Sequence, residues 1–382
     1  MEPVDLVNVL LSPEGRIDPY PLYEELRKHG PLVTVQPGYL VATSFEAVDA
    51  SLRDSKLGVE DASLLLLQSS ILNRNPPDHT RMRRLIAGAF TPKRINRLEQ
   101  AITSQAEALA DAMREKGESA DLMADFAYRL PVGVICELLG VPEKDREWFR
   151  PVASDFAVAL EGTISPLELS AAESAAELLH AYFSDLVRTR RGTPKDDLIS
   201  DLAAAPDLAQ DELLGNLALL LLAGFETTTN LIGNGVMTLL DHPEHLARLG
   251  NHPGLAALYV EEFLRFDSPV QLTSRVAYEP TSLIGYDLEP GSWVMALIGA
   301  ANRDPARFAD ADLFDPDRPG NTSISFGAGA HFCLGAVLAR LEARIAFPLL
   351  LRRFPGLTLA GEPLRRNRLV LRGYESLPIA WT

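Results

Sequence analysis

The segment 211–240 constrains the fold more than any other part of the chain. Apolar residues cover nearly all sides of its centre, including the run LALLLLAGF at 217–225. A helix that is apolar all round must be buried, and this run is far shorter than the ~20 apolar residues of a membrane span. The segment therefore predicts a long central helix, packed inside a soluble protein that has no membrane anchor.

The middle of this predicted helix has an unusual composition. Residues 223–230 read AGFETTTN, with a glycine, a carboxylate and three β-branched threonines in one stretch. Threonine hydroxyls compete for backbone carbonyls, so this composition predicts a bent or loosened helix at its midpoint. A helix that is interrupted where it is buried often marks a ligand site.

Apolar residues at three- and four-residue spacing predict that most of the remaining chain is helical. These helices are expected at 19–29, 45–53, 79–90, 92–116, 121–139, 143–160, 166–190, 243–250 and 254–266. Short strands are expected at 31–43, at 275–299 and within 357–382, where the last two strands would join at Gly373 and Tyr374. No linker or internal repeat divides the chain, so we expect one domain over 1–382, mainly α with small β-sheets.

Charge and cysteine content exclude several functions. The chain has 36 Lys and Arg against 52 Asp and Glu, a formal charge of −16, whereas nucleic-acid binding needs a basic surface. The two cysteines cannot form a four-cysteine metal site or a disulfide framework. The N-terminus is acidic where a signal peptide would be basic, so a cytoplasmic protein is expected.

One of the cysteines lies in an informative sequence, FGAGAHFCLG at 326–335. Glycines surround Cys333, and glycine is favoured where the backbone needs positive φ or where a flat group approaches it closely. A helical pattern follows, and a helix N-terminus stabilises a thiolate. Such a loop suits a thiolate that holds an iron porphyrin, whereas Cys136 lies in an apolar helix and is interpreted as a small buried hydrophobe.

This stretch resembles the haem-binding signature F-G-x-G-x-H-x-C-x-G of the cytochrome P-450 family, and AVLAR at 336–340 continues it. The resemblance extends from about Pro19 to Thr382 and implies the cytochrome P-450 fold with haem b as the cofactor. It makes Cys333 the iron ligand. It also implies that the haem is contacted by Phe326, Gly327, His331 and Gly335.

Other motifs match the same family. The E-x-x-R of Glu262 and Arg265, completed by Arg318 of FDPDRP, resembles the family's buried structural triad. Cationic partners for the haem propionates are implied at His79, Arg83, Arg275 and His331.

The AGFET stretch at 223–227 resembles the family's A-G-x-[DE]-T signature. By that match, Ala223 and Gly224 leave room for oxygen. Glu226 and Thr227 form the acid–alcohol pair that relays protons during oxygen splitting.

The resemblance implies a haem-thiolate monooxygenase that inserts one oxygen atom from O₂ into an apolar small molecule, in bacterial secondary-metabolite biosynthesis. Electrons would come from NAD(P)H through ferredoxin reductase and ferredoxin to a monomeric enzyme. Two alternatives stay open: oxidative coupling or cyclisation without oxygen insertion, and a haem sensor or carrier without turnover. An intact acid–alcohol pair argues against the carrier.

Two surfaces are predicted with less support from motifs. Basic residues near the thiolate side form either a ferredoxin-docking patch or an ordinary mix of solvated charges: Arg84, Lys93, Arg94, Arg340 and Arg344. The substrate pocket is expected around Leu64, Leu67, residues 156–160, Leu220, Val270, Leu272 and Tyr374. The region between Leu57 and Asn75 is shorter than in many relatives, and Tyr374 and Glu375 stand where many relatives are apolar.

Overall fold

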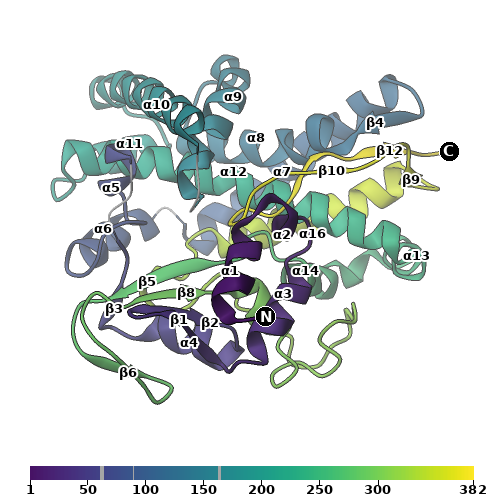
Figure 1. The fold of residues 1–382 in the computed structure, drawn as a ribbon. Coiled ribbons are helices and arrows are strands. Elements are labelled where there is room, and N and C mark those ends of the chain that lie inside the picture. The colour runs from purple at the N-terminus through teal and green to yellow at the C-terminus, as the bar shows by residue number, and fades with distance from the viewer. Residues whose placement is uncertain (61–63, 89, 162–164) are drawn as a thin grey trace. The chain divides into compact units, whose positions relative to one another are not determined.

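The computed structural model describes residues 1–60, 64–88, 90–161 and 165–382, and it is mainly helical with small β-sheets (Figure 1). The α-helices are α1 (Pro3–Leu11), α2 (Pro13–Ile17), α3 (Tyr20–Arg27), α4 (Phe45–Arg53), α5 (Leu65–Gln68), α6 (Asp78–Ala87), α7 (Pro92–Glu115), α8 (Arg129–Leu139), α9 (Arg146–Ala157), α10 (Pro166–Gly192), α11 (Leu198–Ala203), α12 (Gln210–Asp241), α13 (Pro243–Asn251), α14 (Ala256–Phe266), α15 (Ile298–Asn302) and α16 (Ala336–Arg353). The strands are β1 (Leu32–Gln36), β2 (Tyr39–Ala42), β3 (Leu57–Gly58), β4 (Ser119–Asp121), β5 (Thr273–Ala277), β6 (Thr281–Leu283), β7 (Tyr286–Leu288), β8 (Trp293–Ala296), β9 (Thr358–Leu359), β10 (Leu364–Arg365), β11 (Tyr374–Ser376) and β12 (Pro378–Ala380).

The chain divides into two compact units, and each unit is built from three separate segments. The first unit contains Met1–Glu60, Asn234–Cys333 and Leu364–Glu375. The second contains Asp61–Gly233, Leu334–Pro363 and Ser376–Thr382. Because the segments alternate along the sequence, neither unit is a continuous piece of chain.

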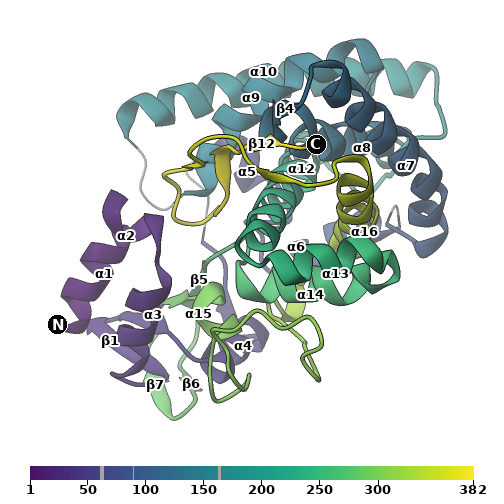
Figure 2. The ribbon, with the colours of Figure 1, turned by 90° about the vertical axis from the view of Figure 1, so that its right-hand side faces the viewer.

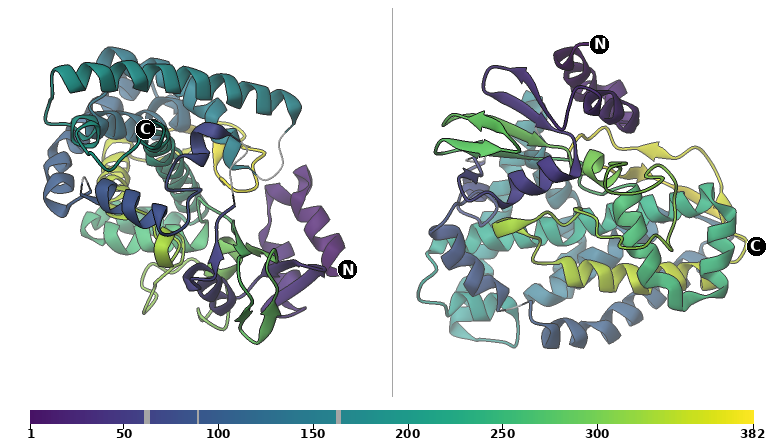
Figure 3. Two further views of the ribbon diagram at one scale, coloured as in Figure 1. Left: turned by 90° about the vertical axis from the view of Figure 1, so that its left-hand side faces the viewer. Right: turned by 90° about the horizontal axis from the view of Figure 1, so that it is seen from below.

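The first unit contains a five-stranded sheet in the order β1-β2-β8-β5-β3. β1 and β2 form the hairpin that the sequence predicts at 31–43, β2 pairs with β8 in parallel, and the other pairs are antiparallel. The right-hand view of Figure 3 shows this sheet with the N-terminal helices at one side. β1 packs against α1, whose residues Leu6, Val7 and Leu10 are buried.

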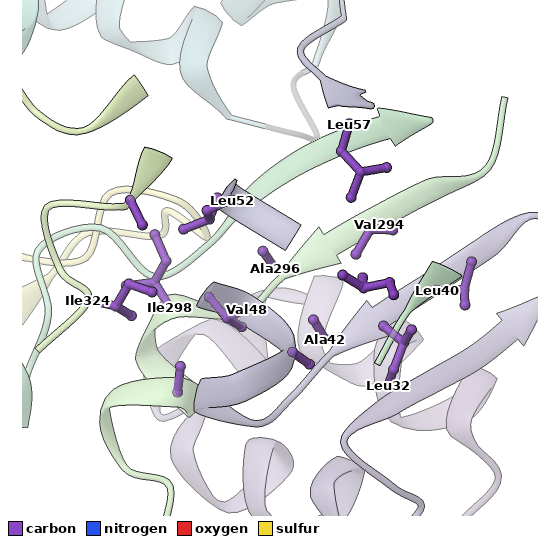
Figure 4. Packing of buried hydrophobic residues seen from close by; sticks show 14 of the residues in the cluster. Leu32, Leu40, Ala42, Val48, Leu52, Leu57, Val294, Ala296, Ile298 and Ile324 are labelled. Carbon is purple, nitrogen blue, oxygen red and sulfur yellow. The ribbon is translucent and has the colours of Figure 1, made fainter. Parts of the chain in front are cut away.

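Helix α4 covers the sheet and forms a hydrophobic core with it. Val48 and Leu52 of α4 lie against Ala296 of β8 (Figure 4). The same core includes Ile324 and Ala328, which flank the start of the glycine-rich loop. The sheet core therefore anchors the segment that leads to Cys333.

The second unit is a helical bundle with a three-stranded sheet in the order β4-β12-β9. α7 and α16 run side by side (Figure 2), and Arg353 of α16 forms a 2.7 Å ion pair with Asp111 of α7. α12 contributes its first 24 residues, Gln210 to Gly233, to this unit and its last turns to the other. Most of its residues are buried, as the apolar sequence predicts.

Some predicted elements differ from the structure. α12 is a continuous helix of 32 residues, so it is not interrupted at its midpoint, and the predicted bend there stays a prediction. The hydroxyls of Thr227 and, further along the helix, Thr238 donate to carbonyls one turn earlier, which the helix tolerates without breaking. The predicted helix 121–139 begins with strand β4 and a short π-helix, Met123–Ala127, before α8.

The C-terminal strands also differ from the prediction. β11 and β12 meet at Leu377 and not at Gly373 and Tyr374, because β11 starts at Tyr374 to pair with β10. The sequence did not predict the short helices α1, α2, α5, α11 and α15. Within the described ranges, no helix is long and apolar enough to cross a membrane.

Candidate active site

The glycine-rich loop folds back on itself just before Cys333. The Cys333 amide donates a hydrogen bond to the carbonyl of Phe326 (3.0 Å), and the Gly327 amide donates to the carbonyl of Ile324 (2.8 Å). Gly327 has φ of +69°, a conformation that costs glycine little. Cys333 is exposed, and α16 begins three residues later at Ala336, as the sequence predicts.

A second glycine in the loop is held much more tightly. Gly329 has φ of +66°, and a Cβ atom at this position would lie 2.2 Å from the carbonyl oxygen of Leu52 in α4. Only glycine permits this approach, since 2.2 Å is far inside van der Waals contact. The glycine-rich motif does not predict this contact of Gly329, because Leu52 lies nearly 280 residues away in the chain.

The predicted structural triad is brought together inside the first unit. Arg265 and Glu262 are fully buried, and the guanidinium donates to both carboxylate oxygens at 2.8 and 2.6 Å. The Nε atom of Arg318 lies 3.6 Å from the Glu262 carboxylate. Glu262 also accepts hydrogen bonds from the Asp315 amide and the Asn321 side chain, both at 2.8 Å.

The two arginines also hold the loop that precedes the glycine-rich segment. Arg265 donates to the carbonyls of Asn302, Ala311 and Leu313 at 2.7 to 3.0 Å. Arg318 donates to the carbonyls of Ala309, Asp310 and Leu313. Because all of these acceptors are backbone carbonyls, the arginines fix the path of the chain.

Arg275 is a buried cation on β5 in the same unit. Burial lowers the pKa of its guanidinium to about 10, although its Nη1 atom donates to the carbonyl of Ser274 (2.7 Å). A carboxylate placed beside Arg275 would favour the charged guanidinium and raise this pKa again. His331 follows the left-handed Gly329 in this unit and is partly buried.

The other two predicted propionate partners belong to the second unit. His79 is buried at the start of α6, and Arg83 follows one turn later on the same side of the helix, partly buried. Between them, Arg81 points to Glu212 of α12 and forms a 2.5 Å ion pair with it. α6 is therefore fastened to α12 beside the two predicted residues.

The centre of α12 exposes small side chains in an otherwise buried helix. Ala223 is exposed and Thr227 is partly exposed, whereas Leu222 and Thr228 are buried. The Thr227 hydroxyl donates to the Ala223 carbonyl at 3.2 Å. Ala223 and Thr227 thus share one accessible strip, which is the arrangement expected of a surface that receives a small ligand.

Glu226 and Gly224 face the protein interior. Glu226 is buried, and the hydroxyl of Tyr128 lies 3.5 Å from its carboxylate. A Cβ atom on Gly224 would lie 2.5 Å from the side chain of Ile135 in α8. Gly224 therefore allows α8 and α12 to pack closely, a role that the A-G-x-[DE]-T resemblance does not predict.

The predicted pocket residues are mostly buried. Leu64, Leu67, Leu220 and Leu272 are buried, Val270 is partly buried, and the Tyr374 ring lies under the Arg365 guanidinium at 4.3 Å. Residues 156–160 end α9 and form a short 3₁₀ turn.

The segment that contains Leu64 and Leu67 is tied to α12. A Cβ atom on Gly215 would lie 2.5 Å from the carbonyl of Leu66, and the Asn216 side chain accepts a hydrogen bond from the Ile71 amide at 3.0 Å. Gly215 and Asn216 were missed by sequence reasoning because neither residue belongs to a recognisable pattern.

Cys136 is not a ligand candidate. It is fully buried in α8, and burial raises the pKa of its thiol to about 12. A thiol with so high a pKa is not a thiolate at neutral pH, so the interpretation as a buried hydrophobe fits.

Together, the described residues fit a thiolate-ligated haem. An accessible thiol lies in a loop with open space around Gly327, and a buried guanidinium in the same unit favours a carboxylate neighbour. Cysteine thiolate and porphyrin iron match in ligand chemistry. No group of three or more metal-ligating side chains occurs in the part of the chain that the structure describes, so a cage of several protein ligands is not seen there.

Comparison with known proteins agrees with this chemistry. The family model for cytochrome P450 matches residues 255–369. The chain is 38% identical over 389 residues to the biotin biosynthesis cytochrome P450 of Bacillus subtilis (strain 168), covering 97% of this chain and 98% of that protein. It is 39% identical over 383 residues to the mycinamicin IV hydroxylase/epoxidase of Micromonospora griseorubida, covering 94% of each.

The fold is similar to that of a solved relative. The crystal structure of P450BioI in complex with hexadec-9Z-enoic acid ligated acyl carrier protein superposes with a TM-score of 0.92 and 37% identity, covering 97% of this chain and 100% of that one. The match confirms the predicted mainly helical fold with small sheets. The chain belongs to the cytochrome P450 family of haem-thiolate oxidoreductases, the monooxygenases.

Proposed function

We propose that the protein binds haem b through the Cys333 thiolate and inserts one oxygen atom from O₂ into an apolar small molecule. The observation that carries this proposal is the accessible thiol of Cys333 in a loop that is closed by its own amide and anchored in the sheet core. When bound, the haem supplies the oxidising chemistry, and thiolate ligation favours O–O cleavage.

The protein's own groups hold the cofactor and control protons. Arg275 and His331 in the first unit, with His79 and Arg83 in the second, are proposed to hold the propionates. Thr227 presents its hydroxyl on the accessible strip of α12, and Glu226 is the buried carboxyl that exchanges protons with solvent. Tyr128 steadies Glu226 by its contact with the carboxylate.

The first test is the absorption spectrum of the dithionite-reduced protein with and without carbon monoxide. A strongly red-shifted Soret band is expected for thiolate ligation. Turnover with a converted substrate under isotopically labelled dioxygen should then place one labelled atom in the product. A band typical of histidine ligation, in the wild-type protein, would overturn the proposed ligand.

The proton relay has a separate test with a matched control. Thr227→Ala removes the accessible hydroxyl, so we expect electrons from NAD(P)H to be diverted into peroxide. Thr238→Ala removes a hydroxyl from the same helix that bonds to the Asn234 carbonyl in the same way (2.8 Å). Product per NAD(P)H should fall in the first variant and stay near wild type in the second, and equal coupling in both would exclude this role.

The same experiments also distinguish the two alternative functions. Oxidative coupling or cyclisation without oxygen insertion would give product that carries no labelled atom. A haem sensor or carrier would bind haem but show no substrate-dependent NAD(P)H oxidation.

The substrate class is proposed as an apolar biosynthetic intermediate. Two similar proteins are named for biotin biosynthesis and mycinamicin hydroxylation, and a solved relative was captured with an acyl chain on acyl carrier protein. A screen of free fatty acids, macrolide-like compounds and acyl carrier protein conjugates by the high-spin spectral shift separates these classes. A shift with the conjugate alone would favour a tethered substrate.

A ferredoxin partner is proposed to dock on basic residues of the second unit. Arg84 and Arg344 are exposed, and Arg340 is partly buried. Arg94 is paired with Asp201 at 2.5 Å, which weakens its part in the patch, and the Lys93 side chain lies outside the described residues. The rate of reduction by ferredoxin should fall as ionic strength rises. It should also fall in Arg344→Gln but not in the control Arg188→Gln on α10. A rate that does not depend on salt would contradict docking on these basic residues.

A further inference from the structure

Asn302 forms a buried hydrogen-bond centre that none of the recognised motifs explains. It is fully buried at the end of α15. Its Nδ2 atom donates to the hydroxyls of Ser268 (2.7 Å) and Ser325 (2.8 Å), and its Oδ1 atom accepts from the Ile324 amide (2.8 Å). The side chain therefore uses both donor hydrogens and its acceptor.

The directions of these hydrogen bonds are fixed by the neighbours. Both serine hydroxyls donate to the carbonyl of Leu264, at 2.7 Å from Ser268 and 2.6 Å from Ser325. This carbonyl belongs to the last turn of α14, where helix carbonyls need partners from outside the helix. Since each hydroxyl proton is used there, each serine oxygen has to accept from Asn302, and only an amide supplies two donors and an acceptor at this position.

Three hydrogen bonds from backbone amides, joined by the short segment 324–327, connect Asn302 to Cys333. Ile324, whose amide it binds, accepts from the Gly327 amide at 2.8 Å, and Phe326 in that turn accepts from the Cys333 amide at 3.0 Å. On the other side, the backbone carbonyl of Asn302 accepts from Arg265 at 3.0 Å. All of these residues belong to the first unit.

We propose that Asn302 is the positioning residue through which the buried Glu262–Arg265 pair fixes the Cys333 loop. The role of the loop as an iron ligand rests on the function proposed above. Loss of the two amide donors leaves the Leu264 carbonyl or the serine oxygens unsatisfied and frees Ser325, which directly precedes Phe326, so the Cys333 loop opens more often. Opening releases the thiolate before the rest of the protein unfolds.

The test compares two isosteric changes in the same unit. Asn302→Asp keeps the size and the acceptor but loses both donors. Asn234→Asp is the matched control, because the Asn234 amide also donates twice, to the carbonyls of Asp267 (3.2 Å) and Arg372 (3.1 Å), without touching the loop. Hydrogen exchange at the amides of Ile324, Gly327 and Cys333 is measured first, and it needs no turnover.

We expect exchange at the Gly327 and Cys333 amides to quicken about tenfold in Asn302→Asp, the effect of losing the one buried hydrogen bond from Asn302 to Ser325 of the loop. The Ile324 amide keeps its acceptor in this variant and serves as the internal reference. Exchange should stay near wild type in Asn234→Asp. On heating the reduced carbon monoxide complex, the red-shifted band of Asn302→Asp should be lost below the global unfolding midpoint measured by circular dichroism, whereas band loss and unfolding should coincide in the control.

The possible failures are distinguishable. Unchanged exchange at Cys333, or band loss that coincides with unfolding in Asn302→Asp, overturns the role of Asn302. Absence of the red-shifted band in the wild type overturns the proposed haem ligation, while the exchange result still decides the loop coupling. If Asn302→Asp does not fold, Ser325→Ala removes one of the same bonds and must show the same selective quickening for the proposal to stand.

Discussion

Single backbone positions in the Cys333 loop differ in what they tolerate. Gly327 and Gly329 both adopt positive φ, at +69° and +66°. Apart from its two chain neighbours, no atom of the described residues would lie within 4 Å of a Cβ on Gly327, whereas a Cβ on Gly329 would meet the Leu52 carbonyl. The two glycines therefore separate the cost of the left-handed backbone from the cost of a steric clash.

Replacing these glycines by alanine should have unequal effects. Gly327→Ala should cost about 1 kcal/mol of unfolding free energy, the strain of a left-handed alanine. Gly329→Ala should cost at least about 3 kcal/mol, because α4 has to move away from the loop. Denaturant unfolding of both variants measures this difference, and equal losses would mean that α4 yields easily.

At the scale of elements, buried charges fasten loops and helices to one another. The Glu262–Arg265 pair is fully buried, whereas Arg248 and Asp317 form a bidentate pair that is largely exposed. Both pairs are close, at 2.6 and 2.5 Å, so distance does not distinguish them. Burial does, because water cannot replace a lost partner inside the protein.

Removing one charge from each pair tests this difference. Glu262→Gln should cost about 3–5 kcal/mol of unfolding free energy, because Arg265 remains buried without its counter-charge. Asp317→Asn should cost less than about 1 kcal/mol. The midpoints and slopes of urea unfolding give both free energies. A small loss of unfolding free energy in Glu262→Gln would show that the carbonyl acceptors alone stabilise the buried Arg265 charge.

A second buried charge ties the N-terminal helices to the C-terminal segment. Asp267 accepts hydrogen bonds from Arg372 (2.7 Å) and Tyr20 (2.9 Å), and Arg372 also donates to the carbonyl of Ile17 (2.9 Å) at the end of α2. Burial alone would raise the pKa of Asp267, but the charges of Arg372 and Arg365 overcome it and lower the pKa from 3.8 to about 2.

This lowered pKa predicts a defined pH dependence. The unfolded carboxyl takes up its proton at higher pH than the folded one, so the stabilisation is complete above 3.8 and is lost as the pH falls towards about 2. The ionised carboxylate should contribute about 2 kcal/mol. The difference in unfolding free energy between wild type and Asp267→Asn should therefore shrink through this window, and a constant difference would contradict the assignment.

At the scale of the whole molecule, the chain alternates between two units. Each unit is made of three segments that are far apart in sequence, and α12 contributes to both. A unit built in this way cannot form from one continuous stretch of chain. We therefore expect the single domain that the sequence suggests to unfold in one transition.

Tryptophan fluorescence measures this directly, because the three tryptophans fall in different units. Trp293 belongs to the first unit, and Trp148 and Trp381 belong to the second. We compare a variant that retains only Trp293 with one that retains only Trp148, each with phenylalanine at the other two positions. In each variant, the fluorescence midpoint should equal the midpoint of the circular dichroism transition of that same variant. Separate midpoints would show two independently unfolding units.

Prediction from the sequence succeeded where the signal is local. The helices with several turns, such as α7, α10 and α12, follow from apolar periodicity, and the hairpin β1–β2 follows from its turn residues. The short helices α5 and α15 were missed because four or five residues carry too little periodicity. α12 is continuous across AGFETTTN, where the back-bonded Thr227 hydroxyl does not break the helix.

By itself, the sequence determined which chemical groups the protein contains and how they are spaced along the chain. These are the glycine-rich loop around Cys333, the E-x-x-R on α14, and the acid and alcohol side chains of α12. Tertiary structure alone decided which distant groups meet them. It placed the Leu52 carbonyl against Gly329, Ile135 against Gly224, and Arg372 against Asp267 across 105 residues. Periodicity and motif spacing report on neighbours within a few turns, whereas these contacts arise only when packed helices and strands bring separate segments together.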